Sequence, residues 1–110
     1  MPDLSGVRLK YLNECDPDQM EWAVKQMTPQ PFGAFQEKVT LDFSKLKNIP
    51  ITYIFCTHDT IVSKKEMKYF ISILPKQTLI QEIRADHVPM VSNPQGLGEI
   101  LHTTSFSSDL

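Results

Sequence analysis

The chain has 110 residues, 41% of them hydrophobic and 22% charged, and its formal net charge at pH 7 is −2. This length accommodates one modest core and predicts a single domain. The eleven basic residues are scattered apart from Lys64 and Lys65, so no phosphate-tracking surface forms and we expect no nucleic-acid partner. No apolar run is long enough to span a bilayer, and the N-terminus lacks a basic segment followed by an apolar one. We therefore expect no membrane partner and a cytoplasmic location.

The first third of the chain contains one clear helix signal. Residues 1–14 show no sustained period, and we assign no element there. Asp16 is a suitable N-cap, Pro17 suits the first helical position, and Gln19 stands where a capping box places its partner. A short amphipathic helix is predicted from Pro17 to about Met27, ended by the two prolines that follow.

The segment 32–47 mixes isolated aromatic residues with charges. Val39, Leu41 and Phe43 alternate with polar residues, which indicates one edge strand or an extended segment there.

The central part of the chain predicts a βαβ unit. Ile51–Cys56 is an almost continuously apolar, β-branched run, typical of a parallel strand covered on both faces. Ser63 and Glu66 have the spacing of a helix start, and Pro75 ends that helix. The second strand is predicted over Thr78–Ile83, and a crossover helix between two strands makes them parallel. The apolar face of the helix consists of Met67, Phe70, Ile71 and Leu74.

A last helix is predicted to begin at Asn93 and Pro94, with an inward face formed by Leu97, Ile100 and Leu101. The tail, 105–110, is expected to fray.

Two ionisable residues follow the two predicted strands. Asp59 follows the first strand and His87 the second, and ligands in open α/β sheets bind at this edge. A carboxylate that fixes the tautomer of an imidazole leaves the second ring nitrogen free to act as a general base. The alternative roles are a polar residue in the turn from a strand to a helix for Asp59, and a loop histidine bonded to backbone for His87. We interpret Asp86 as a loop or surface acid and expect Asp59, rather than Asp86, to face the imidazole.

No metal or cofactor is predicted. Cys56 and His58 share a strand face, but further ligands with zinc-like spacing are absent. Cys15 and Cys56 have very different surroundings, so we expect reduced thiols, and burial in a strand argues against Cys56 as a nucleophile. The four glycines form no phosphate-binding loop.

Several motifs resemble the α/β-hydrolase superfamily, in the branch of plant-type methylesterases, hydroxynitrile lyases and related bacterial esterases. Met27–Phe32 resembles the end of the cap region of this branch, and Ile49–Asp59 resembles its penultimate strand and triad acid. Ala85–Met90, followed by Asn93–Gln95, resembles its histidine loop and last helix. The resemblance implies the chain order serine, acid, histidine, with Asp59 and His87 in the last two roles.

The first role of that triad is empty, because no serine of the chain lies in a G-x-S-x-G elbow and no H-G-type oxyanion loop occurs. The resemblance therefore implies an α/β fold that is the C-terminal part of an α/β-hydrolase. Residues 1–47 would be a cap remnant and connecting segment, 48–104 the βαβ-α part of the core, and 105–110 the tail.

The functional interpretation is the acid–histidine half of a serine hydrolase for small carboxylic esters, inactive as this chain alone. Its expected partners are an ester substrate in the complete enzyme, and either a second copy of the chain or the missing N-terminal half. One alternative is a non-catalytic α/β domain that binds a partner through an unpaired strand edge. The other is a hydroxynitrile lyase fragment. The lyases of this branch place a lysine directly after the histidine, where this chain has Val88.

Overall fold

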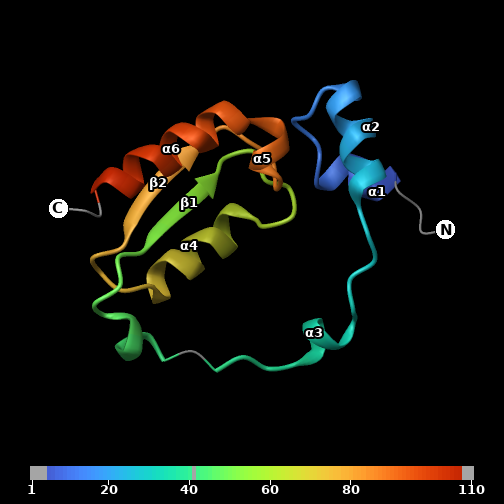
Figure 1. Cartoon of the computed structure of the whole chain (residues 1–110). Helices are drawn as coiled ribbons and strands as arrows, with labels where there is room; N and C mark the ends of the chain where they lie inside the picture. Colours follow the sequence, from blue (N-terminus) through green and yellow to red (C-terminus); the bar gives the residue numbers. More distant parts are fainter. Residues whose placement is uncertain (1–4, 41, 108–110) are drawn as a thin grey trace.

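The computed structural model of the chain describes residues 5–40 and 42–107, and its centre is a βαβ unit (Figure 1). Strand β1 (Thr52–Cys56) pairs in parallel with β2 (Leu79–Ile83), in the register that places the first residues of the two strands opposite each other. Helix α4 (Lys64–Ile73) covers one face of this sheet and α6 (Pro94–Ser107) the other. The predicted strand–helix–strand order and the parallel pairing are confirmed.

The predicted capping signals start the helices where expected. In α2 (Pro17–Gln26), the Asp16 carboxylate accepts from the Gln19 N–H at 2.8 Å, and the Gln19 side chain accepts from the Asp16 N–H at 3.0 Å. In α4, the Ser63 hydroxyl accepts from the Glu66 N–H at 3.1 Å. Each contact satisfies a backbone donor that has no partner within its helix.

The N-terminal segment contains a helix that the sequence did not predict. Helix α1 (Ser5–Lys10) has only six residues, too few to show a hydrophobic period. The segment that follows it contains Leu12, which is completely buried, and Cys15, and both pack with Ala23 of α2. Since short helices are marginal in isolation, this packing stabilises α1.

Residues 27–40 and 42–50 form an arm, an open arc that leads from α2 to β1 (Figure 1). It contains the short helices α3 (Gly33–Gln36) and η1 (Phe43–Leu46). No described residue of the arm is in a strand, so the edge strand is wrong, which leaves the extended segment as the other prediction for this stretch. Val39 is 77% exposed, and Leu41 lies outside the described residues. Alternating residues form a strand only beside a strand that offers hydrogen bonds, and β1 and β2 lie elsewhere. The open arm contributes to a radius of gyration of 16.1 Å, against about 13 Å for a compact domain of 100 residues.

The C-terminal helix α6 begins after Asn93, whose side-chain oxygen accepts from the Gly96 N–H at 3.0 Å. The predicted start is confirmed, but Leu101, expected inward, is 51% exposed. The tail predicted to fray is helical up to Ser107, and its last three residues lie outside the described part.

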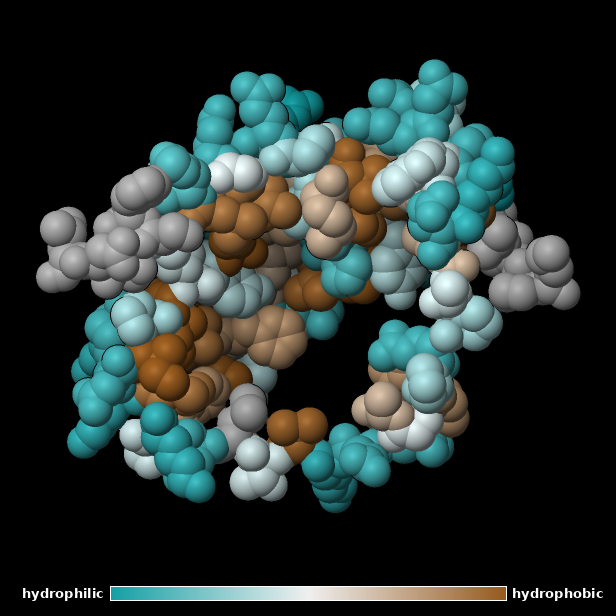
Figure 2. Space-filling view, viewed as in Figure 1, coloured by the Kyte–Doolittle hydropathy of each residue, from teal (hydrophilic) through white to brown (hydrophobic). Residues whose placement is uncertain are grey.

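Much apolar surface is uncovered. Within the described residues, β1 pairs only with β2, so its other edge offers unpaired backbone groups. Figure 2 shows apolar side chains at the surface of the βαβ unit and beside the arm. More than half-exposed apolar side chains outside the arm include Leu9, Trp22, Tyr69, Leu79, Met90 and Leu101.

We expect the isolated chain to associate with itself or to be only marginally stable, because exposed apolar edges find partners. Sedimentation velocity over a range of concentrations, with thermal unfolding on the same samples, measures both properties. A monomer at all concentrations that unfolds in one cooperative transition would contradict this expectation.

Candidate active site

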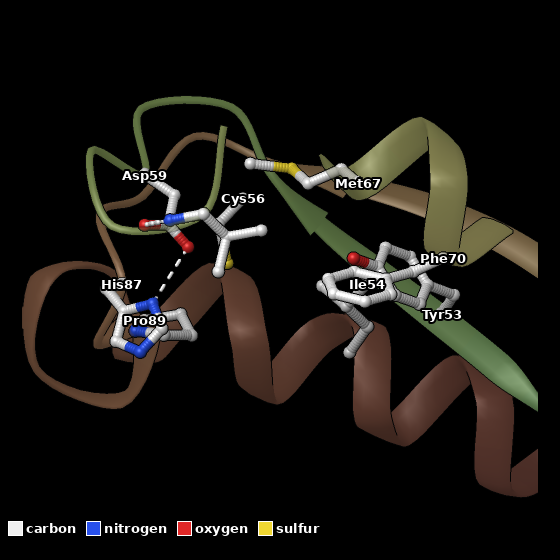
Figure 3. Close-up of a pocket in the computed structure, with 9 residues that line it drawn as sticks. Tyr53, Ile54, Cys56, Asp59, Met67, Phe70, His87 and Pro89 are labelled. Atoms are coloured by element: carbon white, nitrogen blue, oxygen red, sulfur yellow. Dashed lines mark hydrogen bonds and ion pairs between the residues drawn. The ribbon is translucent and has the colours of Figure 1, made fainter. Parts of the chain in front are cut away.

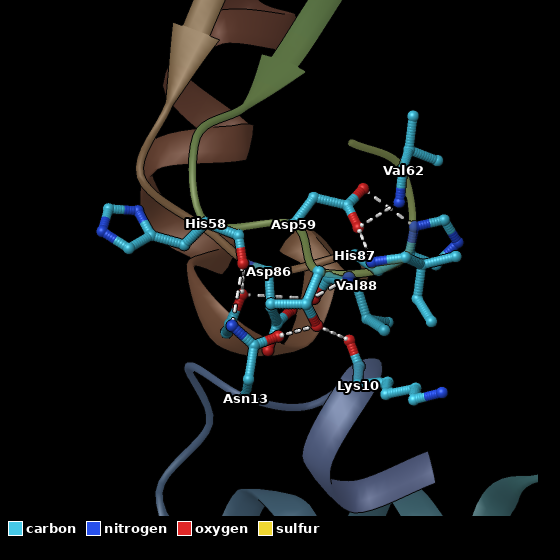
Figure 4. Close-up of polar contacts among 11 residues, drawn as sticks. Lys10, Asn13, His58, Asp59, Val62, Asp86, His87 and Val88 are labelled. Carbon is cyan, nitrogen blue, oxygen red and sulfur yellow. Dashed lines mark hydrogen bonds and ion pairs between the residues drawn. The ribbon is translucent and has the colours of Figure 1, made fainter. Parts of the chain in front are cut away.

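The loops that follow β1 and β2 leave the same edge of the sheet side by side. Beyond the last paired strand residues, the backbone N–H of His58 still donates to the Ala85 carbonyl at 3.0 Å. The Asp59 carboxylate then faces the imidazole of His87, with 2.9 Å between Oδ2 and Nδ1 (Figure 4). The contact expected from the sequence is confirmed.

Asp59 is held by both of its oxygens. While Oδ2 contacts His87, Oδ1 accepts from the backbone N–H groups of Ile61 at 2.8 Å and Val62 at 3.0 Å. The side chain is only 7% exposed. Burial raises the pKa of the Asp59 carboxyl, but the hydrogen bonds from His87, Val62 and Ile61 outweigh burial and lower the pKa overall. Asp59 therefore closes the turn that leads toward α4 and contacts the histidine at the same time, and it is ionised at neutral pH.

The lowered pKa of Asp59 predicts an acid-dependent loss of stability. A carboxyl whose pKa is lower in the folded than in the unfolded state stabilises the fold above its unfolded pKa, and this stability is lost as pH falls through the folded pKa. We expect Asp59→Asn to remove part of the fall in urea midpoint between pH 7 and pH 3. Asp18→Asn, in an exposed first turn, is the control. An unchanged pH dependence in Asp59→Asn would contradict the prediction.

The imidazole of His87 is positioned to act through its second nitrogen. Because Nδ1 contacts a carboxylate, the favoured neutral tautomer carries its proton on Nδ1, and Nε2 keeps a lone pair. The side chain is 36% exposed. The ring of Tyr11 packs against it edge-on, with centroids 5.2 Å apart and planes at 79°. The alternative of a histidine bonded to backbone does not describe this ring.

A cavity of about 280 Å³ opens beside the Asp59–His87 pair, between the free edge of β1, α4 and the histidine loop (Figure 3). Apolar side chains form most of its wall, so it suits a small apolar group attached to a reacting centre at His87. Its lining consists of Tyr53, Ile54, Cys56, Asp59, Val62, Met67, Phe70, His87 and Pro89.

Asp86 lies in a loop, which is one of the two places that the sequence predicted, but it is not a surface acid, since its exposed fraction is 0%. Its carboxylate points to the N-terminal segment, where it accepts from the Glu14 N–H at 3.0 Å and the Cys15 thiol at 3.4 Å. It also accepts from the Val88 N–H at 2.9 Å. As expected, Asp86 and His87 diverge, but Asp86 is buried because a distant segment of the chain covers it.

The N-terminal segment supplies further residues around the site that sequence reasoning missed. Besides Tyr11, Asn13 donates to the His58 carbonyl at 2.8 Å, and the Thr60 hydroxyl donates to the Lys10 carbonyl at 2.5 Å. No short-range sequence pattern predicts these contacts, because each joins residues more than forty positions apart. The short helix α5 (Pro89–Ser92), which directly follows the histidine loop, was also not predicted.

The remaining candidate groups have other roles. Cys15 and Cys56 are free thiols. Burial raises the pKa of the Cys56 thiol, with a further contribution from the charges of Asp59 and Asp86, so this thiol is protonated at neutral pH. Burial likewise raises the pKa of Cys15, to about 12. Among the described residues, no group of three or more His, Cys, Asp and Glu side chains is arranged to hold a metal ion.

Within the described part of the chain, no helix combines the length and the apolar character that a bilayer crossing requires.

Comparison with solved structures identifies the fold. Two crystal structures of polyneuridine aldehyde esterase, one of them a histidine-to-alanine mutant, match this chain with TM-scores of 0.74 and 0.73 at 22% sequence identity. Each match covers 90% of this chain but only 40% of the esterase chain. No family model matches the sequence, and a search of the curated proteins finds no match. The esterase is an α/β-hydrolase, and the chain therefore has the fold of part of an α/β-hydrolase.

Proposed function

We propose that the chain carries the acid and the histidine of a serine hydrolase for small carboxylic esters, with His87 as general base and Asp59 as its orienting carboxylate. The observation that supports this most strongly is the 2.9 Å contact between Asp59 Oδ2 and His87 Nδ1. It occurs at the carboxyl edge of parallel strands, in part of an α/β-hydrolase fold, which is where such folds place their chemistry.

In this proposal, Nε2 of His87 takes the proton of a serine hydroxyl as that oxygen attacks the ester carbonyl, and later returns it to the leaving alcohol. Asp59 holds the imidazole in the required tautomer and stabilises the imidazolium that forms. The serine and the oxyanion donors come from outside these 110 residues, because no G-x-S-x-G elbow occurs in the sequence. The apolar cavity beside His87 receives a small group of the ester.

The test is to read the coding region upstream of Met1 and to express the protein that it encodes together with this chain. An in-frame G-x-S-x-G, labelling of its serine by a fluorophosphonate, and saturable hydrolysis of p-nitrophenyl acetate are expected. An upstream region without such a serine, or hydrolysis that survives replacement of His87, would contradict the proposal.

A second candidate function is a non-catalytic domain that binds the remaining part of an α/β-hydrolase. The unpaired edge of β1, with a cavity beside it, favours this reading, because an extended apolar segment could add to the sheet there. The remaining part of the hydrolase is the inferred partner, because this chain spans only 40% of the solved chains that it matches. Asp59→Asn separates the two functions, since it lowers kcat about 10⁴-fold under the first and leaves association unchanged under the second.

We expect ester hydrolysis rather than cyanohydrin cleavage. Departing cyanide needs a nearby positive charge, and Val88, directly after His87, has none. Parallel assays of the serine-bearing protein with p-nitrophenyl acetate and mandelonitrile measure the preference. Faster release of cyanide than of nitrophenol would show that this assignment is wrong.

A further inference from the structure

Asp86 is a completely buried acid next to the general base, and the chemistry proposed for Asp59 and His87 does not use it. Burying a carboxylate is costly unless donors compensate it. Within the described residues it is in no ion pair. Its three hydrogen-bond partners, the Val88 N–H, the Glu14 N–H and the Cys15 thiol, are all donors, so the carboxylate acts as the acceptor in every contact.

The two oxygens of Asp86 serve different segments. Oδ1 accepts from the Val88 N–H at 2.9 Å, which closes a turn around His87. Oδ2 accepts from the Glu14 N–H and the Cys15 thiol, which belong to the linker between α1 and α2. One side chain therefore shapes the histidine loop and ties it to the N-terminal segment.

The Ser92 side chain makes two further hydrogen bonds to the backbone of the same turn. The Ser92 hydroxyl of α5 lies 3.3 Å from the Asp86 N–H, which donates to it, and 3.4 Å from the Val88 carbonyl, to which it donates. The backbone on both sides of His87 is thus held at three points. The linker that Asp86 holds also carries Tyr11, whose ring contacts the imidazole of His87.

We propose that Asp86 is a positioning residue for His87: through the turn to Val88 and the tie to the α1–α2 linker, it holds the imidazole where Asp59 can orient it. The catalytic part of this inference rests on the proposed function, in which His87 is the general base. The reason is geometric, because a displacement of about 1 Å at a catalytic group can lower a rate about 10²-fold. The contact at stake is the 2.9 Å hydrogen bond between Asp59 and His87.

The test uses Asp86→Asn in the 110-residue chain, with histidine labelled by ¹⁵N. An amide has the shape of the carboxylate, but one of its two ends donates, so it cannot accept from all three donors. Long-range ¹H–¹⁵N correlation shows which ring nitrogen of His87 carries the proton. The unchanged chain should show the Nδ1–H form, and Asp86→Asn should lose it. Asp18→Asn, the same change at an exposed helix position, should keep it.

The results distinguish a role of Asp86 in positioning His87 from a role in fold stability alone, and from failure of the proposed function. If Asp86→Asn melts earlier but keeps the Nδ1–H form, positioning is overturned. If Asp59→Asn also keeps that form, the acid–histidine pair itself fails. If Asp59→Asn loses the form and Asp86→Asn does not, only the positioning inference fails. In the serine-bearing protein, Asp86→Asn should lower kcat about 10²-fold with little change in KM.

If Asp86→Asn does not fold, hydrogen exchange in the unchanged chain decides. The amide protons of Glu14 and Val88 are hydrogen-bonded to the Asp86 carboxylate, so they should exchange with solvent more slowly than the amide protons of the exposed arm. Exchange of either amide as fast as in the arm would overturn the inference.

Discussion

Replacing His87 by alanine in the serine-bearing protein is expected to lower kcat for a short ester about 10⁶-fold, and Asp59→Asn about 10⁴-fold. Loss of the imidazole removes the group that we propose takes the serine proton. Loss of the carboxylate's charge leaves the base in place but allows the wrong tautomer. The unequal effects follow from the contact geometry, in which only His87 would face the reacting hydroxyl.

Single-turnover and steady-state hydrolysis of p-nitrophenyl acetate measure both effects. His58→Ala is the matched control, since its side chain contacts Thr57 rather than the acid–histidine pair and should leave kcat unchanged. Equal losses in His58→Ala and His87→Ala would indicate damage to the fold. Retention of activity in His87→Ala would exclude the proposed role.

The 110-residue chain alone is expected to hydrolyse activated aryl esters no faster than buffer containing free imidazole at the same concentration. Removing the nucleophile of a triad costs about 10⁶-fold and leaves only residual catalysis from binding and oxyanion donors. This chain has neither a G-x-S-x-G serine nor an H-G-type oxyanion loop.

The measurement compares rates at rising substrate concentration for the chain, for His87→Ala and for imidazole. A linear dependence on substrate with no saturation is expected. A saturable rate that a serine-directed phosphonate abolishes would show that the chain contains a working nucleophile of its own.

The parts of the structure that the sequence predicted correctly are those set by short-range patterns. Helices α2 and α4 begin where their capping residues predict, because a cap acts over three positions and needs no distant partner. The parallel β1–β2 pair follows from two apolar runs joined by a helix, and the Asp59–His87 contact follows from that pair.

Asp86 illustrates the opposite case. Its neighbours in the sequence are typical of a loop, and only the approach of the α1–α2 linker converts it into a buried acceptor. The βαβ unit and the residues at its carboxyl edge could be predicted from the sequence, since hydrophobic period, caps and strand ends are local properties. The burial of Asp86, the Tyr11 contact with His87, helix α1 and the open course of the arm could not be predicted, because they depend on the folded arrangement of the chain. They are set by contacts between segments far apart in the chain, or by the lack of a neighbouring strand among the described residues, and no short-range pattern encodes either.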